Sequence, residues 1–154
     1  MIRPAVLFVC LGNICRSPLA EAAFRAEAAT AGLDAVADSA GTADYHVGEP
    51  PDPRAVRTAA KFGSDISRYC GRQVSAADFV RFTHIFALDH ANLKNLQKIA
   101  PAGHPAQLGL LLDLVPGRTD QAVADPWHGN EQGFLVTWVE VSAAARALVG
   151  GLTK

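Results

Sequence analysis

The chain has 154 residues, of which 49% are apolar and 19% charged, and its formal net charge is −1. These values predict one folded domain over residues 1–154, exclude a disordered chain, and argue against nucleic-acid binding through bulk charge. The three cysteines are an odd number, which does not suit a secreted disulfide framework, so we expect a cytoplasmic protein.

The first elements read as a strand, a loop and a helix. Residues 5–10 are apolar and partly β-branched, which is typical of a strand buried on both faces. This run is too short for a signal sequence or a membrane span, and we expect no membrane insertion. Residues 11–16 interrupt it. Ser17 is then a suitable N-cap with Pro18 at the first helical position, and Gly32 closes the helix.

The remaining elements continue this alternation. In chain order we predict a strand at 35–40, a loop at 42–53, a helix at 54–62 stopped by Gly63, a short helix at 75–81, a strand at 84–88, and a helix capped by Asp89 and ending near Ile99. A fourth strand is expected within 107–114, followed by a loop at 116–130. The last element is a helix at 131–149 whose apolar stripe is Phe134, Trp138, Val141, Ala145 and Leu148. Strands that alternate with helices indicate an α/β fold with a parallel sheet and right-handed crossovers.

One segment, residues 10–17, carries residues suited to phosphate chemistry. Cys10 and Arg16 stand six positions apart across the loop from the first strand to the first helix. Ligands bind at this edge of parallel sheets, and the free N–H groups at a helix start attract anions. Gly12 permits unusual backbone angles and Asn13 tolerates the left-handed region. Arg16 can offer two donors to a phosphate.

The chemistry expected here is nucleophilic. A thiol near a helix N-terminus and an arginine loses its proton more readily, and the Ser17 hydroxyl could donate to the sulfur of Cys10. Attack on phosphorus would then form a phosphocysteine in the first of two steps. The leaving group needs a proton, and Asp125 is the natural donor because Pro126 favours an extended backbone at residue 125. Asp125 would act as acid first and as base toward water second.

These residues lie within a longer pattern. Residues 6–21, Val-Leu-Phe-Val-Cys-Leu-Gly-Asn-Ile-Cys-Arg-Ser-Pro-Leu-Ala-Glu, resemble the N-terminal signature of the low-molecular-weight protein tyrosine phosphatases. The resemblance continues along the chain at residues 38–42, at Tyr45 with 48–52, and at 71–73, 87–89 and 125–129. A cysteine and an arginine at this spacing are weak evidence alone, but the flanks and the distant Asp-Pro make the pattern specific.

The resemblance implies a fold and an activity. It implies a four-stranded parallel sheet flanked by helices, with a phosphate-binding loop between the first strand and the first helix, and no metal or other cofactor. It also implies hydrolysis of phosphotyrosine in proteins, with inorganic phosphate as product and inhibitor, by a monomer or weak dimer. The implied roles are Cys10 as nucleophile, Arg16 as phosphate clamp, Asp125 as general acid, Gly12, Ile14 and Cys15 in phosphate binding, Asn13, Ser17 and Ser39 in loop support, and Leu11, Tyr45 and Trp127 in an aromatic slot.

The chain departs from the family pattern in two places. The family usually has two tyrosines after Asp-Pro, and here Trp127 and His128 replace them. An aromatic wall remains, but regulation by phosphorylation of those tyrosines is lost. Many members have a histidine before the Ala-Arg-Gln element that supports the asparagine. Residues 68–70, Arg-Tyr-Cys, stand there instead, which leaves open what supports Asn13.

Several alternatives stay open at this point. Cys15 is either a buried cysteine at the helix start or a partner for a reversible disulfide with Cys10. An arsenate reductase would need two further cysteines, and only Cys70 follows. A protein-arginine phosphatase would have threonine at Ile14. A non-catalytic phosphate-binding module would need neither Cys10 nor Asp125.

The histidines favour no metal site. The five imidazoles are scattered along the chain without the paired spacing of metal ligands. His128 is the exception of interest, because it lies three residues from Asp125 and could touch substrate.

Overall fold

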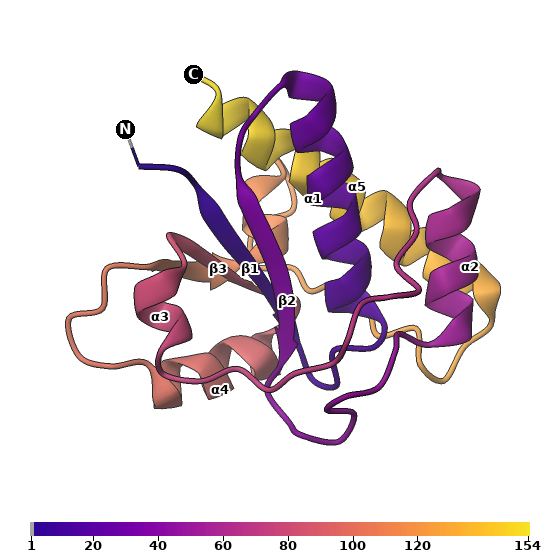
Figure 1. Cartoon of the computed structure of the whole chain (residues 1–154), viewed down its shortest axis with the longest axis horizontal. Coiled ribbons are helices and arrows are strands. Elements are labelled where there is room, and N and C mark those ends of the chain that lie inside the picture. Colours follow the sequence, from indigo (N-terminus) through magenta and orange to yellow (C-terminus); the bar gives the residue numbers. More distant parts are fainter. Residues whose placement is uncertain (1) are drawn as a thin grey trace.

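A computed structural model describes residues 2–154, and it has one parallel sheet between two layers of helices (Figure 1). The strands are β1 (Ala5–Cys10), β2 (Val36–Gly41), β3 (His84–Ala87) and β4 (Gln107–Leu110), in the order β2-β1-β3-β4. The helices are α1 (Arg16–Ala31), α2 (Pro53–Lys61), α3 (Asp78–Arg81), α4 (His90–Ile99), the 3₁₀ helix η1 (Leu111–Leu114) and α5 (Glu131–Leu152). The predicted α/β fold with a four-stranded parallel sheet is confirmed.

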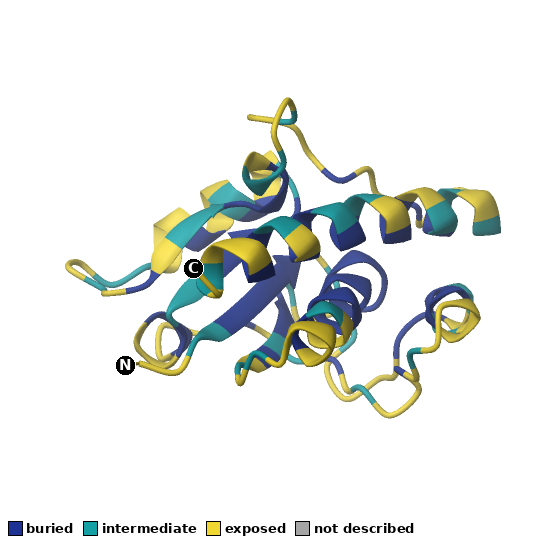
Figure 2. Cartoon of the chain, turned by 90° about the horizontal axis from the view of Figure 1, so that it is seen from above, coloured by how far each residue is buried: buried dark blue, intermediate teal, exposed yellow. Residues whose placement is uncertain are grey.

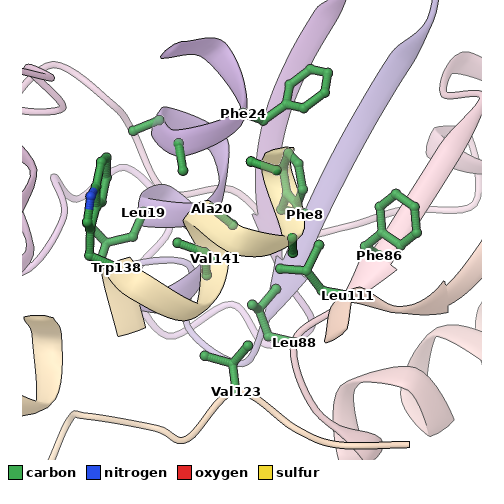
Figure 3. Packing of buried hydrophobic residues seen from close by; sticks show 14 of the residues in the cluster. Phe8, Leu19, Ala20, Phe24, Phe86, Leu88, Leu111, Val123, Trp138 and Val141 are labelled. Carbon is green, nitrogen blue, oxygen red and sulfur yellow. The ribbon is translucent and has the colours of Figure 1, made fainter. Parts of the chain in front are cut away.

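The central strand β1 divides the interior into two cores. Its side chains alternate, so that Val6 and Phe8 join the core under α1 and α5, while Leu7 and Val9 join the core with α3 and α4. Figure 2 shows the strands and the inward faces of the helices buried. In Figure 3, Phe8 lies between Phe24 of α1 and Val141 of α5. A strand covered on both faces explains the uninterrupted apolar run at the start of the sequence.

The last helix, α5, has the predicted apolar stripe. All five predicted stripe residues are buried, and Trp138 also stacks on Phe62 with ring centroids 5.1 Å apart. By length and composition α5 could cross a membrane. Its stripe packs against α1 and the sheet, however, as in the core helix of a globular fold.

The start of α1 differs from the prediction. The N-cap position is Cys15, which makes no side-chain cap, and Ser17 lies inside the helix. The Ser17 hydroxyl is engaged instead by Cys10 and Asn13 of the preceding loop. The end of α1 is as predicted, because Gly32 has a left-handed φ of 68° and closes the helix.

Several other element boundaries also move, among them the end of the fourth strand and the start of α2. The fourth strand lies within the predicted range 107–114 but ends at Leu110, because the buried Leu111 and Leu112 continue as a 3₁₀ helix. A leucine run is buried in either conformation, so it does not mark the strand end. Asp52 caps α2, which begins at Pro53, one residue before the prediction. Asp89 caps α4 as predicted.

The strand order creates a crevice beside β1. The chain leaves β1 for β2 on one side and returns to β3 on the other side of β1. Ligands of open α/β sheets bind outside the carboxyl ends of strands at such a switch point. The segment after β1 and the residues after β3, Leu88 and Asp89, meet there.

Candidate active site

The segment from Cys10 to Arg16, here called the phosphate loop, is shaped by Asn13. Asn13 has a left-handed φ of 59°, as expected. Its amide donates to Ser17 Oγ at 2.8 Å, and its Oδ1 accepts from the backbone N–H of Arg72 at 3.1 Å. The Arg72 backbone therefore supports the asparagine in a chain that lacks the family's histidine at residues 68–70.

Gly12 contributes space beside His46, which is not the role predicted for it. Its φ is not positive, so the expectation of unusual backbone angles was wrong. A Cβ at Gly12 would instead lie 3.0 Å from Cδ2 of His46. Glycine here provides space for the His46 ring, which also pairs with Glu49 at 3.1 Å.

The sulfur of Cys10 lies on the floor of the phosphate loop. It accepts from the backbone N–H of Asn13 at 3.3 Å and lies 3.1 Å from Ser17 Oγ. Within the described residues, the backbone N–H groups of Gly12, Ile14 and Cys15 make no hydrogen bond. Free N–H groups at a helix N-terminus can receive the oxygens of an anion.

Arg16 is buried and fixed by two acceptors. Its NH1 donates to Asp89 Oδ2 at 2.8 Å and to the carbonyl of Val123 at 3.0 Å. Asp89 holds this position because its other oxygen caps α4 through the N–H of Asn92. Val123 is anchored to Leu88, its neighbour in Figure 3, by a backbone bond of 2.8 Å. The remaining donors of Arg16 are left for a ligand.

Asp125 approaches Arg16 from a distant loop. Its Oδ1 accepts from the N–H of Trp127 at 3.0 Å, and its Oδ2 lies 3.8 Å from NH2 of Arg16. The side chain is 48% exposed. Oδ1 of Asp125 is therefore engaged by a hydrogen bond within its own loop, while Oδ2 faces Arg16.

These groups surround one cavity of about 310 Å³. Its lining residues are Cys10, Leu11, Gly12, Ile14, Cys15, Arg16, Tyr45, His46, Asp125, Trp127 and His128. The structure thus gathers the predicted phosphate-binding and slot residues, with Asn13 and Ser17 behind the loop. Within residues 2–154, no three His, Cys, Asp or Glu side chains lie close enough to hold a metal ion.

Ser39, which was predicted to support the phosphate loop, is hydrogen-bonded to helix α1. Its hydroxyl donates to Glu21 Oε1 of α1 at 2.8 Å, and Arg25 donates to the other oxygen of Glu21 at 2.9 Å. Burial raises the pKa of Glu21, while Ser39 and Arg25 oppose that shift. Any support from Ser39 therefore passes through α1.

The second cysteine, Cys15, is buried and unpaired, like Cys10. Burial raises the pKa of the Cys15 thiol, and the nearby Asp52 carboxylate adds to the shift. Both effects disfavour the thiolate form of Cys15.

Sequence reasoning missed three site contributors. Asp89 was assigned only as a helix cap, although its place directly after β3, beside β1, was a usable signal. His46 was treated as an ordinary loop histidine. Nothing in the sequence indicated that Arg54 would donate to the backbone around Asp125.

Comparisons with known proteins agree with this geometry. The family model "Low molecular weight phosphotyrosine protein phosphatase" matches residues 5–154. A protein of that name from Schizosaccharomyces pombe is 44% identical over 139 residues, covering 88% of each chain. A low molecular weight protein-tyrosine-phosphatase from Streptomyces coelicolor is 40% identical, covering 97% of this chain and 93% of its own.

A solved structure of a tyrosine phosphatase has the same fold. The crystal structure of a protein tyrosine phosphatase from Entamoeba histolytica, with Hepes in its active site, superposes with a TM-score of 0.92. It is 33% identical and covers 97% of both chains. The chain therefore belongs to the low molecular weight phosphotyrosine protein phosphatase family.

Proposed function

We propose that the protein, a protein tyrosine phosphatase by family and fold, hydrolyses phosphotyrosine through a cysteinyl-phosphate intermediate on Cys10. In the first step the Cys10 thiolate attacks phosphorus and the bond from phosphorus to the tyrosyl oxygen breaks. Asp125 donates its proton to that oxygen. The phosphoryl oxygens accept from the free N–H groups of the phosphate loop and from Arg16, which stabilises the charge that they carry.

The second step restores the enzyme. The Asp125 carboxylate takes a proton from water, the water oxygen bonds to phosphorus, and the sulfur–phosphorus bond breaks. Cys10 leaves as a thiolate and inorganic phosphate is released, and this product competes for the same donors. Every proton and bond is accounted for by the protein, the substrate and one water.

One observation carries this proposal. The buried Cys10 sulfur, the unpartnered N–H groups, the fixed Arg16 and the Asp125 carboxylate all border one cavity. A module that only binds phosphate would need neither the thiol nor the carboxylate. The aromatic rings of Tyr45 and Trp127 at the cavity suit an aryl phosphate.

The cellular setting is part of the same proposal. Cys10 must be a free thiol to react, and all three cysteines are unpaired, which suits the reducing cytoplasm. We place the protein there as a monomer or weak dimer, acting on phosphotyrosine proteins. His128 borders the cavity and is suited to contact the substrate.

The test is hydrolysis of para-nitrophenyl phosphate and of a phosphotyrosine peptide in the presence of EDTA. Wild type should be active on both, and Cys10→Ser should lose nearly all activity while still binding vanadate. Asp125→Ala should lose about 10²–10⁴-fold in kcat. Wild type that binds vanadate but hydrolyses neither substrate would replace this proposal by the binding-module alternative.

Specificity for aryl phosphate is tested separately at Ile14, which is buried in the cavity wall. Wild type should hydrolyse the phosphotyrosine peptide in preference to a phosphoarginine peptide, and Ile14→Thr should narrow that preference. A wild-type preference for phosphoarginine would contradict the proposed substrate.

A further inference from the structure

Arg54, at the start of α2, donates to the backbone of the loop that carries Asp125. This loop, residues 125–129, is here called the acid loop. Arg54 NH1 donates to the Gly129 carbonyl at 2.9 Å and NH2 donates to the Trp127 carbonyl at 3.1 Å. The guanidinium also lies 5.6 Å from the Trp127 ring centroid and 4.7 Å from that of Phe134.

The same guanidinium is fixed from its other side by Asp52. Arg54 Nε donates to Asp52 Oδ1 at 3.0 Å, and NH2 donates to Oδ2 at 3.0 Å. The Asp52 backbone N–H donates to the carbonyl of Ile14 in the phosphate loop at 2.8 Å. A continuous series of hydrogen bonds therefore runs from the phosphate loop through Asp52 and Arg54 to the acid loop.

The acid loop has few other hydrogen bonds. Its remaining hydrogen bonds are local, from the N–H of Gly129 to Pro126 and from the N–H of Trp127 to Asp125. Among the described residues, Arg54 is the only one outside the acid loop that donates hydrogen bonds to its carbonyls. The ion pair from Arg16 to Asp125 is long, at 3.8 Å. A general acid must nevertheless be held close to its productive geometry, because small displacements are costly.

We propose that Arg54 is a positioning residue that fixes the acid loop relative to the phosphate loop, so that Asp125 meets the leaving oxygen. Arg54 does not border the cavity itself and acts through Asp125. The inference rests on the proposed role of Asp125 as general acid.

The geometry requires a guanidinium at this position. Arg54 uses separate nitrogens for the two carbonyls while both oxygens of Asp52 are engaged. A lysine carries the charge but offers one nitrogen and no planar fork. Arg54→Lys should therefore restore little of the activity that Arg54→Gln loses.

The experiment measures kcat/KM for aryl phosphates in Arg54→Gln and Arg54→Lys, each alone and combined with Asp125→Ala. We expect each single variant to lose about tenfold, since loosened positioning costs transition-state stabilisation. Inhibition by inorganic phosphate should stay within about twofold of wild type, because the phosphate loop keeps its own contacts. In the Asp125→Ala background the Arg54 substitutions should cause almost no further loss.

The leaving group provides a readout that a purely structural role would not change. Para-nitrophenolate leaves readily without a proton, whereas the phenolate of phenyl phosphate needs one. The Arg54 variants should therefore lose more activity on phenyl phosphate than on para-nitrophenyl phosphate. Arg57→Gln is the matched control, since Arg57 is also on α2 but pairs with Glu131 at 2.8 Å. Its kinetics should equal those of wild type.

The possible failures are distinguishable. If Asp125→Ala loses activity but the Arg54 variants do not, the inference about Arg54 is wrong and the proposed mechanism stands. The inference is also overturned if the Arg54 substitutions lower kcat/KM by the same factor in the Asp125→Ala background as in wild type. It is overturned as well if they weaken inhibition by phosphate to the same extent as they lower kcat/KM. In either case Arg54 would act on the whole site and not through Asp125. If Asp125→Ala itself retains activity, the proposed general acid fails, and the inference fails with it.

Discussion

The phosphate loop and the acid loop border the same cavity but are held in different ways. The phosphate loop is buried except at Leu11 and Gly12, and side chains within residues 10–17 make many of the contacts that shape it. Its outside anchors include Asp52, Arg72, Asp89 and Val123. The acid loop is mostly exposed and is fixed from outside by hydrogen bonds from one arginine. The hydrogen bonds that shape the phosphate loop therefore come largely from one short segment, whereas the carbonyls of the acid loop accept from an arginine that is 73 and 75 positions away in sequence.

The largest effect should follow from breaking the phosphate loop at Arg16. Arg16 donates to Asp89 and Val123 through one nitrogen, which leaves its other nitrogens for phosphate. Arg16→Lys keeps the charge but has a single nitrogen, which cannot serve both purposes. We expect kcat/KM to fall about 10²–10³-fold and inhibition by phosphate to weaken in steady-state assays. The control is Arg146→Lys, a half-exposed arginine of α5 near Glu27. Unchanged phosphate inhibition in Arg16→Lys would show that Arg16 does not bind the anion.

A smaller loss should follow from releasing Arg16 without removing it. Asp89→Asn keeps an oxygen to cap α4 but removes the charge that holds NH1 of Arg16 at 2.8 Å. Loss of the charge-assisted hydrogen bond between Asp89 and Arg16 should therefore lower kcat/KM about tenfold. Asp120→Asn, in an exposed pair with His90, should have no effect on the same assay. Equal activity of the two variants would contradict the role assigned to Asp89.

The shape of the phosphate loop is tested at Asn13, through stability. Asn13→Ala and Asn13→Gly both lose the bonds to Ser17 and Arg72, but only alanine is strained at a φ of 59°. In urea unfolding we expect alanine to be less stable than glycine by about 1 kcal/mol. If alanine is as stable as glycine, the left-handed backbone does not persist in solution.

The smallest effect concerns the link between the two loops, at Asp52. Hydrogen bonds from Arg54 hold the pKa of Asp52 below its usual range. A lowered folded-state pKa stabilises the protein at pH above the unfolded value of about 3.9, and this stabilisation is lost as the pH falls through the folded-state pKa. Asp52→Asn should therefore be less stable than wild type near neutral pH, with a difference that shrinks below about pH 4. A difference independent of pH in urea unfolding would show that the ion pair contributes nothing.

Sequence reasoning succeeded where neighbouring residues determine the structure. The apolar run of β1, the Gly32 end of α1 and the buried stripe of α5 each follow from local pattern, and all are confirmed. The fourth strand lies within the range predicted for it, but its end could not be predicted, because burial alone does not distinguish a strand from a 3₁₀ turn.

In the candidate site, too, local features were predicted and contacts between distant segments were not. The composition of residues 10–17 indicated a phosphate loop, but Ser17 lies within α1, and its hydroxyl contacts Cys10 and Asn13 of the loop and does not cap the helix. Gly12 matters through the distance to His46, a contact between segments that a single sequence does not reveal. The bonds from Arg54 to the acid loop likewise exist only after α2 packs beside it.

The most direct test of the central claim is to trap the intermediate. Asp125→Ala lacks the base for the second step, so phosphoenzyme should accumulate when this variant is mixed with para-nitrophenyl phosphate and quenched with acid. Mass spectrometry of the digested protein should find one phosphate on the peptide that contains Cys10, and none in Cys10→Ser. Turnover with an unmodified Cys10 peptide, or with phosphate on another residue, would contradict the cysteinyl-phosphate mechanism.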